Sequence, residues 1–342
     1  MKKILALLLM ACCAAVHAQT ADELLNEGKN TENVTLLGTG YDMKMFSPLK
    51  QINKSNIKRL VPLWTFSLSN DMGELSQPTI YNGVMYVVNG NWTFAIDVGT
   101  GRQMWRTPVS YDRGALRMTT GGAYMRGAAT IYNGKLFRQT IDGHVLALDM
   151  KTSKELWKTK FGEWKESYAG IVAPAIVNGV LISGMAGGDR TARGFVDGYD
   201  PETGKRLWRT WTVPEPGQKG SETWPNKDLP DAWKYGGAAT WQPGSYDPQL
   251  DLFTSAPAIR SPTTRNIAPA WTACMPHRYW RSGRRPANWS GITSMCQTIP
   301  STLTVPRRAS LPTCRSTASR VRCCSTSIRT AFSTCLIAPM AS

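Results

Sequence analysis

Short apolar runs separated by polar turns follow one another along the chain and predict β-strands. The segments "TIYNGVMYVV" (79–88), "TIYNGKLFRQ" (130–139) and "AIVNGVLISG" (175–184) each place Asn-Gly between two apolar stretches. Asn and Gly accept the positive φ angles of a tight hairpin turn, so each segment predicts two antiparallel strands joined by that turn. The pattern favours an all-β fold.

An internal repeat organises these hairpins. The segments "AIDVGTGRQMW" (95–105), "ALDMKTSKELW" (147–157) and "GYDPETGKRLW" (198–208) share a strand end, an Asp, a Thr-Gly or Thr-Ser turn and a Trp. The three Trp residues are 52 and 51 residues apart. Because a hairpin precedes each copy, one repeat contains about four short strands, which is one blade of a β-propeller.

A single four-stranded blade cannot bury both of its faces, so the blades must stack radially. The repeated Trp residues are expected to dock between neighbouring blades in a structural role. Residues 19–253 at this period provide four to five blades. We therefore predict a partial β-propeller over 19–253.

The first residues, "MKKILALLLMACCAAVHA" (1–18), predict a signal peptide. Two lysines precede an apolar run that is too short to span a bilayer, and small residues stand before Gln19. Cleavage after Ala18 and export to the periplasm are expected. A lipoprotein signal around Cys12 is the alternative. No later segment is long and apolar enough to form an integral membrane span.

The composition changes abruptly after Phe253. The chain has a net charge of +16, but residues 254–342 contain 12 Arg, no Lys and no Asp or Glu, which leaves 28 basic against 24 acidic residues before them. Six of the eight Cys also lie in this segment. Such a Ser-, Thr-, Pro- and Arg-rich segment without an apolar period predicts an unstructured tail. A nucleic-acid-binding arm is the competing interpretation of the arginines, but the frameshift inferred below accounts for them, so no nucleic-acid partner is expected.

Several motifs together resemble the pyrroloquinoline quinone (PQQ) dependent alcohol dehydrogenases, a family of periplasmic eight-bladed propellers that includes the methanol dehydrogenases. They are "MFSPLKQINKSNIKRLVPLW" (45–64), the Asp/Thr-Gly/Trp repeats, "GGDRTARGFVDGYDPETG" (187–204) and "GGAATWQPGSYDPQLDLF" (236–253). The resemblance covers residues 30–253, about the N-terminal half of the family's fold.

The resemblance implies a cofactor and residues that hold it. PQQ is a planar quinone with three carboxylates, so its site needs flat apolar walls, cations, and a Lewis acid at the reactive carbonyl. By motif match, Trp241 would form the stacking floor, and Arg126 would contact the quinone. Asp189, beside Gly187 and Gly188, stands where the family places a metal-binding Glu, and its carboxylate suits calcium or a lanthanide.

Structural interpretations of the same residues remain open. Trp241 could be another docking Trp, Arg126 a surface arginine, and the Gly-Gly-Asp sequence only a turn. The family's glutamate before Pro78 is replaced by Leu75, with Glu74 one position away as the substitute for cofactor binding.

The tail itself carries a hidden form of the repeat. When codons permitted for residues 287–300 are regrouped by one base, they allow "ELVWHYQYVPNDP", preceded by a permitted Thr-Gly, which together form a further Thr-Gly/Trp repeat. Regrouped codons also allow "IGTGNP" from residues 255–260 and "NGFFYVLDRANG" from residues 330–341, and both resemble family sequence. We therefore predict a frameshift directly after Phe253.

The predicted frameshift removes the family's general-base aspartate and an asparagine metal ligand, so no catalytic residue is assigned. The expected function is that of a quinoprotein alcohol dehydrogenase by descent. It would oxidise a primary alcohol to an aldehyde with PQQ and pass electrons to a c-type cytochrome, while this chain is expected to be inactive. The alternative function is a non-catalytic propeller that scaffolds other envelope proteins.

Overall fold

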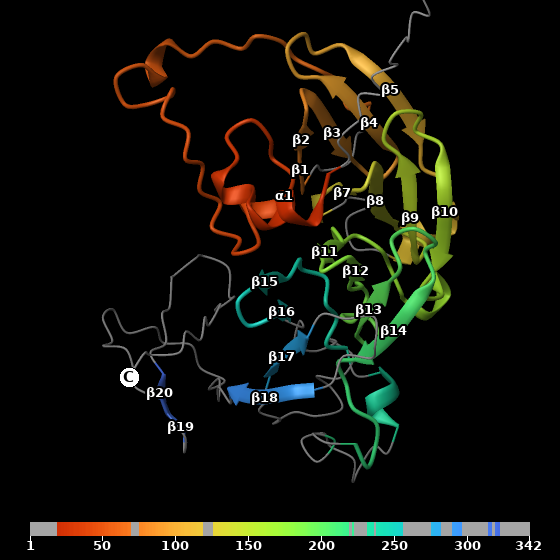
Figure 1. The fold of residues 1–342 in the computed structure, drawn as a ribbon. Helices are drawn as coiled ribbons and strands as arrows, with labels where there is room; N and C mark the ends of the chain where they lie inside the picture. The colour runs from red at the N-terminus through yellow and green to blue at the C-terminus, as the bar shows by residue number, and fades with distance from the viewer. Residues whose placement is uncertain are drawn as a thin grey trace, which may run out of the picture. The chain divides into compact units, whose positions relative to one another are not determined.

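The computed structural model describes six ranges of the chain together with the backbone of four later strands (Figure 1). The six ranges are 19–69, 75–118, 126–218, 221, 231–235 and 237–255. The chain divides into two compact units, Met1–Gln297 and Thr298–Ser342. In the second unit the described residues form a hairpin of β19 (Cys314–Ser316) and β20 (Ser319–Val321). No helix within the described ranges is long and apolar enough to cross a membrane. The predicted signal peptide lies outside these residues.

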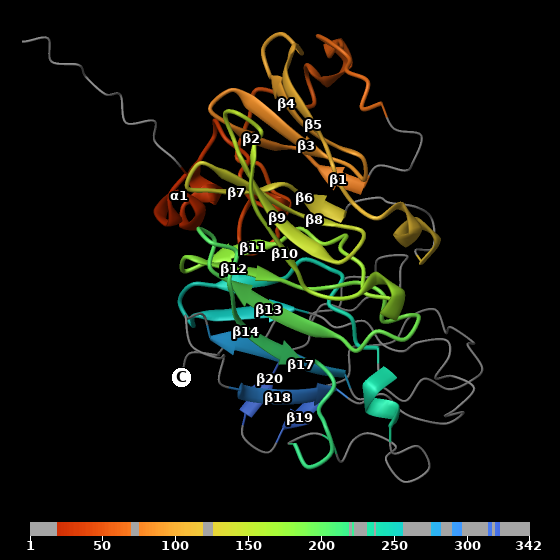
Figure 2. The same ribbon diagram turned by 90° about the vertical axis from the view of Figure 1, so that its right-hand side faces the viewer.

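Four antiparallel sheets of four strands, here called blades A to D, make up the first unit (Figures 1 and 2). Blade A contains β2 (Thr79–Tyr81), β3 (Val84–Val88), β4 (Trp92–Asp97) and β5 (Gln103–Pro108). Blade B contains β7 (Thr130–Tyr132), β8 (Lys135–Thr140), β9 (His144–Asp149) and β10 (Glu155–Lys160). Blade C contains β11 (Ala175–Val177), β12 (Val180–Ser183), β13 (Phe195–Tyr199) and β14 (Arg206–Trp211). Blade D contains β15 (Ser245–Asp247), β16 (Leu252–Ser255), β17 (Met275–Arg281) and β18 (Trp289–Met295).

The remaining elements are short. A two-stranded parallel sheet joins β1 (Leu75–Gln77) to β6 (Arg126–Ala128). The other described elements are one α-helix and six 3-10 helices: α1 (Ala21–Leu25), η1 (Glu27–Lys29), η2 (Leu37–Thr39), η3 (Ile57–Arg59), η4 (Arg113–Met118), η5 (Trp164–Glu166) and η7 (Ala232–Tyr235). The predicted all-β, partial propeller is confirmed.

The Asn-Gly pairs form the predicted hairpin turns. Asn82, Asn133 and Asn178 have φ angles of 50°, 47° and 46°, and the glycine after each also has a positive φ. Asn and Gly tolerate this left-handed region at the lowest steric cost, which explains their repetition at the first turn of blades A to C.

The repeated Trp residues dock between blades, as predicted. The indole Nε1 of Trp105 in blade A donates to Met150 O in blade B at 3.0 Å, and Trp157 in blade B donates to Pro201 O in blade C at 3.1 Å. Trp64 follows the same rule, because its Nε1 donates to Val98 O of blade A at 2.9 Å. Each indole thereby ties one repeat to the Asp/Thr-Gly turn of the next.

Apolar clusters continue this packing from blade to blade. Tyr86 and Ala95 of blade A share one cluster with Ile131 and Leu136 of blade B. Equivalent clusters join blade B to blade C, and blade C to Phe253 of blade D. Burial of such side chains contributes about 1.5–3 kcal/mol each, so most of the stability lies at the blade interfaces.

An N-terminal strap, residues 19–46, contacts all four blades. Its backbone pairs with Ile80 of blade A through Val34, and Gln19 O accepts from the Asn133 N–H of blade B at 3.0 Å. Tyr41 reaches the other two blades: its hydroxyl donates to Ile176 O of blade C at 2.5 Å, and its carbonyl accepts from the Tyr246 N–H of blade D at 3.1 Å. The sequence of residues 19–46 carries no repeat that would predict this strap.

The composition boundary at Phe253 falls inside a strand. β16 continues to Ser255, and β17 and β18 complete blade D within the segment expected to be an unstructured tail. The rest of that segment, apart from β19 and β20, lies outside the described residues. The frameshift stays a prediction.

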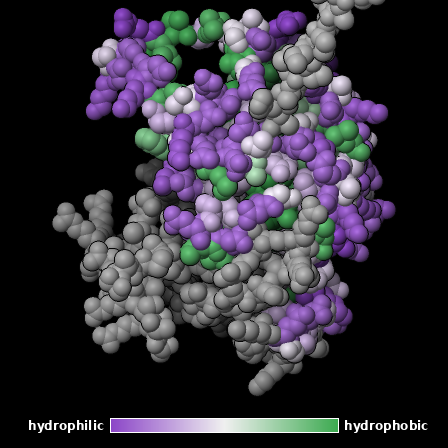
Figure 3. Space-filling view, viewed as in Figure 1, coloured by the Kyte–Doolittle hydropathy of each residue, from purple (hydrophilic) through white to green (hydrophobic). Residues whose placement is uncertain are grey.

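Residues 45–63 expose an unusual number of large apolar side chains. Phe46, Val61 and Leu63 are 69%, 80% and 83% exposed, and five other large apolar residues of this segment are also exposed. Green apolar groups accordingly lie among purple polar ones where this segment passes across the upper part of Figure 3. The next residues, 64–68, alternate instead, and Trp64, Phe66 and Leu68 pack on blade A.

Candidate functional site

The candidate site is centred on Trp241, in the connection between β14 and β15. This partly buried indole packs against two clusters at once. One cluster contains Ile141, Ala169 and Ala186, and the other contains Phe195 and Ala239. Trp241 thus lies over the ends of blades B and C. It stands apart from the docking residues Trp105 and Trp157, which join the outer strand of one blade to the turn of the next.

Gly187 and Gly188 lie in the turn after β12, close to the Trp241 segment. Gly187 has a φ of +107°, and a Cβ there would come within 1.7 Å of Ser167 O. A Cβ on Gly188 would lie 2.7 Å from the Ala239 Cβ, two residues before Trp241. Both glycines are therefore needed for close chain packing beside the indole. Their assignment as cofactor-binding residues stays a prediction.

Asp189 follows these glycines and is exposed. It lies in the turn that leads to β13, where the Arg190 and Thr191 N–H groups donate to Gly187 O. Among the described residues there is no group of three or more His, Cys, Asp or Glu that could hold a metal ion. Asp189 supplies an exposed carboxylate directly after Gly188.

The other two predicted cofactor residues are less fully described. Arg126 begins β6 and pairs with Leu75 of β1 in a parallel register, while its side chain lies outside the described residues. Glu74 also lies outside them. Ile171 packs against the same cluster as Trp241.

The segment before Trp241 is attached to blade C by hydrogen bonds. The buried Thr240 hydroxyl donates to Phe195 O at 2.6 Å and accepts from the Met185 N–H at 3.2 Å. The Thr212 hydroxyl donates to Ala238 O at 2.7 Å. Sequence reasoning missed this attachment, because isolated threonines carry no periodic signal.

A buried ion pair supports the cluster beneath Trp241. Arg209 donates from Nε and Nη2 to Asp197, at 2.7 and 2.6 Å, and its guanidinium stacks on the Phe195 ring at 3.5 Å. Burial raises the pKa of Asp197, while hydrogen bonds from Arg209 and Tyr199 oppose that shift. Removing one partner of a buried pair leaves an uncompensated charge, so the Arg209–Asp197 pair is costly to break and keeps the guanidinium on the Phe195 ring.

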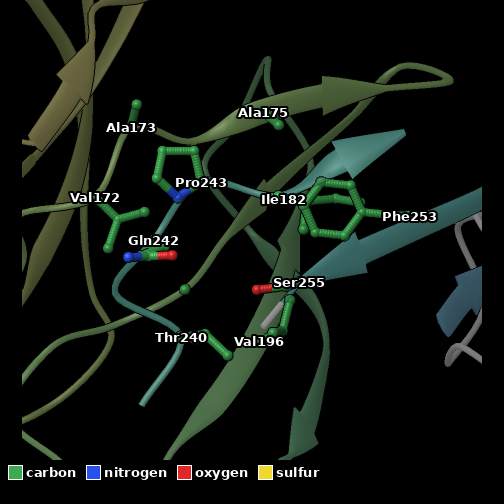
Figure 4. A pocket seen from close by; sticks show the side chains of 12 residues that line it. Val172, Ala173, Ala175, Ile182, Val196, Thr240, Gln242, Pro243, Phe253 and Ser255 are labelled. Carbon is green, nitrogen blue, oxygen red and sulfur yellow. The ribbon is translucent and has the colours of Figure 1, made fainter. Parts of the chain in front are cut away.

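A small cavity lies behind the Trp241 segment, between blades C and D (Figure 4). Its volume is about 10 Å³, which corresponds to roughly one water molecule. Thr240, Gln242 and Ser255 provide its polar lining, and Val196 and Phe253 are among its apolar residues. A cavity of this size cannot hold an organic cofactor, so it is separate from the candidate site.

The geometry fits one wall of a site for a planar ligand. Trp241 offers an aromatic ring, and the residues packed near it include the small side chains Ala169, Ala186 and Ala239. Larger side chains such as Ile141 and Phe195 pack near it as well, so the ring lies on a continuous apolar surface. The metal-binding part fits less well, because the described residues contain no group of three or more His, Cys, Asp or Glu that could hold a metal ion.

Comparisons with known proteins agree with the motifs. Residues 36–256 match the family model described as the PQQ glucose/ethanol/alcohol dehydrogenase β-propeller domain. The chain is 34% identical over 280 residues to the quinoprotein alcohol dehydrogenase PedH of Pseudomonas putida, covering 76% of this chain and 46% of that protein. It is 32% identical over 299 residues to methanol dehydrogenase [cytochrome c] subunit 1 of Methylobacterium organophilum, covering 78% and 47% of the two chains.

Solved structures show the same relationship. A europium-containing methanol dehydrogenase superposes with a TM-score of 0.71 at 28% identity, covering 78% of this chain and 50% of that one. A quinohemoprotein alcohol dehydrogenase from Comamonas testosteroni gives a TM-score of 0.71 at 25% identity, covering 78% and 42%. The chain spans less than half the length of the curated relatives that it matches.

Proposed function

Because the chain belongs to the PQQ-dependent alcohol dehydrogenase family, we propose that it represents part of an enzyme that oxidises a primary alcohol to an aldehyde. The observation that carries the proposal is the Trp241 wall over blades B and C, which lies in the region matched by the family model. Bound PQQ supplies the two-electron oxidant for such chemistry. A c-type cytochrome is the proposed electron acceptor.

Each proposed cofactor residue has a different task. Trp241 stacks on the ring system of PQQ and excludes water from that face. Arg126 neutralises negative charge on the quinone or its carboxylates. Glu74, Gly187 and Gly188 border the site, and Asp189 provides one hard oxygen ligand for calcium or a lanthanide.

No general base is assigned among the described residues. We therefore propose that this chain is inactive as an alcohol dehydrogenase. General acid–base assistance contributes about 10² to 10⁴ in rate, and its loss alone would reduce turnover severely. We further propose that one base is missing directly after the codon for Phe253. The restored reading frame would then supply the aspartate and the remaining blades.

Dye-linked alcohol oxidation tests the proposal. The chain and its frame-restored counterpart are expressed with the signal peptide, and periplasmic fractions are assayed with PQQ and either calcium or a lanthanide. The restored enzyme should turn over a primary alcohol, its Trp241→Ala variant should lose most of that activity, and the 342-residue chain should show none. Trp105→Ala controls for general loss of packing.

Two results would redirect the interpretation. Comparable turnover by the 342-residue chain would show that its own residues carry the chemistry. A folded, frame-restored protein without PQQ-dependent activity would favour the scaffolding function. Recovery of both proteins from the cytoplasm with an uncleaved leader would contradict the proposed periplasmic location.

A further inference from the structure

We propose that blade C fixes the orientation of the Trp241 ring through the buried hydroxyl of Thr240, which makes Thr240 a positioning residue for the candidate site. The identity of the ligand that stacks on Trp241 rests on the proposed function. The attachment of Trp241 to blade C rests on geometry alone. By sequence order the indole would be assigned to blade D, because β15 begins at Ser245.

The Thr240 hydroxyl uses both of its hydrogen-bonding roles on blade C. It donates to Phe195 O at the start of β13, at 2.6 Å, and accepts from the Met185 N–H just after β12, at 3.2 Å. The residue is only 1% exposed, so water cannot replace either partner. Loss of this hydroxyl would leave a buried carbonyl and a buried N–H unsatisfied, which costs more than loss of an exposed hydrogen bond.

Backbone packing reinforces the attachment on both sides. A Cβ on Gly184 would lie 2.2 Å from Thr240 O, and one on Gly194 would lie 2.0 Å from Ala238 O. The Gly194 N–H donates to Gly237 O at 2.7 Å, and the Thr212 hydroxyl donates to Ala238 O at 2.7 Å. These contacts hold the segment from 237 to 240 directly on blade C.

Alternation along the segment then separates the two functions of its side chains. Thr240 and Gln242 both line the small cavity between blades C and D, as Figure 4 shows. Trp241 does not line that cavity and packs instead on the clusters around Ala186 and Ala239. Adjacent side chains of this segment thus face different surroundings. Anchoring Thr240 therefore determines which way Trp241 faces.

Fluorine NMR of the whole chain labelled with 5-fluorotryptophan tests this inference. The Trp241 resonance is assigned by its absence in Trp241→Phe. Thr240→Val keeps the side-chain shape but removes the hydroxyl, so the Trp241 resonance should shift or broaden. Thr240→Ser keeps the hydroxyl and should restore the wild-type position. Thr212→Val should shift the same resonance in a smaller degree.

A matched control comes from another blade interface. The Thr159 hydroxyl donates to Gly204 O at 2.7 Å, between blades B and C, in a contact similar to that of Thr240. Thr159→Val should perturb the neighbouring Trp157 and leave the Trp241 resonance in place. If Thr240→Val fails to fold, Thr240→Ala, which removes the same hydroxyl, decides the question together with Thr212→Val. An unchanged Trp241 resonance in the folded hydroxyl-deletion variants would overturn the inference.

Titration with PQQ separates this inference from the proposed function. PQQ should move the Trp241 resonance of the wild-type chain, and Thr240→Val should weaken binding about three- to tenfold, as expected for one buried hydrogen bond. No response to PQQ, together with a resonance shift in Thr240→Val, would contradict the proposed ligand and support the positioning role. A response to PQQ with equal affinity in wild type and Thr240→Val would refute the role of Thr240.

Discussion

Alanine at Gly204 should destabilise the chain more than alanine at Gly134, although the two glycines have φ angles of +70° and +71°. Both substitutions place a Cβ in the left-handed region, which costs about 1–2 kcal/mol. Only at Gly204 is the space occupied, because its Cβ would lie 2.5 Å from the Trp157 ring. Gly134 has nothing within 4 Å.

The extra loss of stability in Gly204→Ala depends on how far the Trp157 indole can move away from the added Cβ. Overpacking typically costs about 1–3 kcal/mol, and retreat would also stretch the hydrogen bond from Trp157 to Pro201 O. The equivalent turn of blade B shows that this loss of stability has an upper limit. Ser153 occupies the equivalent position there with a φ of 60°, and Trp105 still donates to Met150 O. We therefore expect Gly204→Ala to lose about 1–3 kcal/mol more than Gly134→Ala.

Urea unfolding followed by tryptophan fluorescence measures this difference directly. The midpoints are compared at equal m-values, so that a change in the denatured state is not mistaken for a change in stability. Equal losses for the two variants would refute the reasoning, because they would mean that the indole does not occupy the space beside the turn. Gly101→Ala, whose Cβ would lie 2.6 Å from the Trp64 ring, should behave like Gly204→Ala.

Two further predictions concern acid stability and self-association. Burial would raise the pKa of Asp142, but hydrogen bonds from His144, Thr140 and the Asp112 N–H hold it well below its usual range. This contribution to stability is present above the unfolded-state pKa of about 4 and is lost as the pH falls below it. Asp142→Asn should therefore cost about 1–3 kcal/mol at pH 7 and progressively less in acid, measured by urea midpoints against Asp42→Asn. Leu63→Lys should reduce concentration-dependent light scattering because Leu63 is 83% exposed, whereas Thr65→Lys controls for added charge and should change it less.

The features that sequence predicted well are those fixed by local chemistry and repeated along the chain. Asn82 with Gly83 needs only a hairpin turn, and the spacing of Trp105 and Trp157 follows from one blade per repeat. The N-terminal strap was missed because the contacts that Val34 and Tyr41 make to different blades follow no period along the chain. Such contacts depend on which blades stand side by side, and this is known only after folding.

The boundary after Phe253 illustrates a different limit. Composition changes there, yet β16 continues to Ser255 and pairs with β17, because the antiparallel ladder is formed by backbone groups that every residue except proline provides. A change in the side-chain pattern therefore indicates where burial changes, but it does not locate the residue at which a strand ends.

The candidate site lies where the repeat is interrupted. A long connection separates blade C from blade D. It runs from Trp211 at the end of β14 to Ser245 at the start of β15, and it contains Trp241. The repeat supplies rigid edges, and the irregular connection can lie on them at a geometry that no single blade dictates. The role of Thr240 can be recognised in the structure but not in the sequence, because its hydrogen-bond partners, Phe195 and Met185, belong to the preceding blade. A substitution in the core of blade C that moves Phe195 should consequently displace the Trp241 ring more than a substitution in β15, although β15 is nearer in sequence.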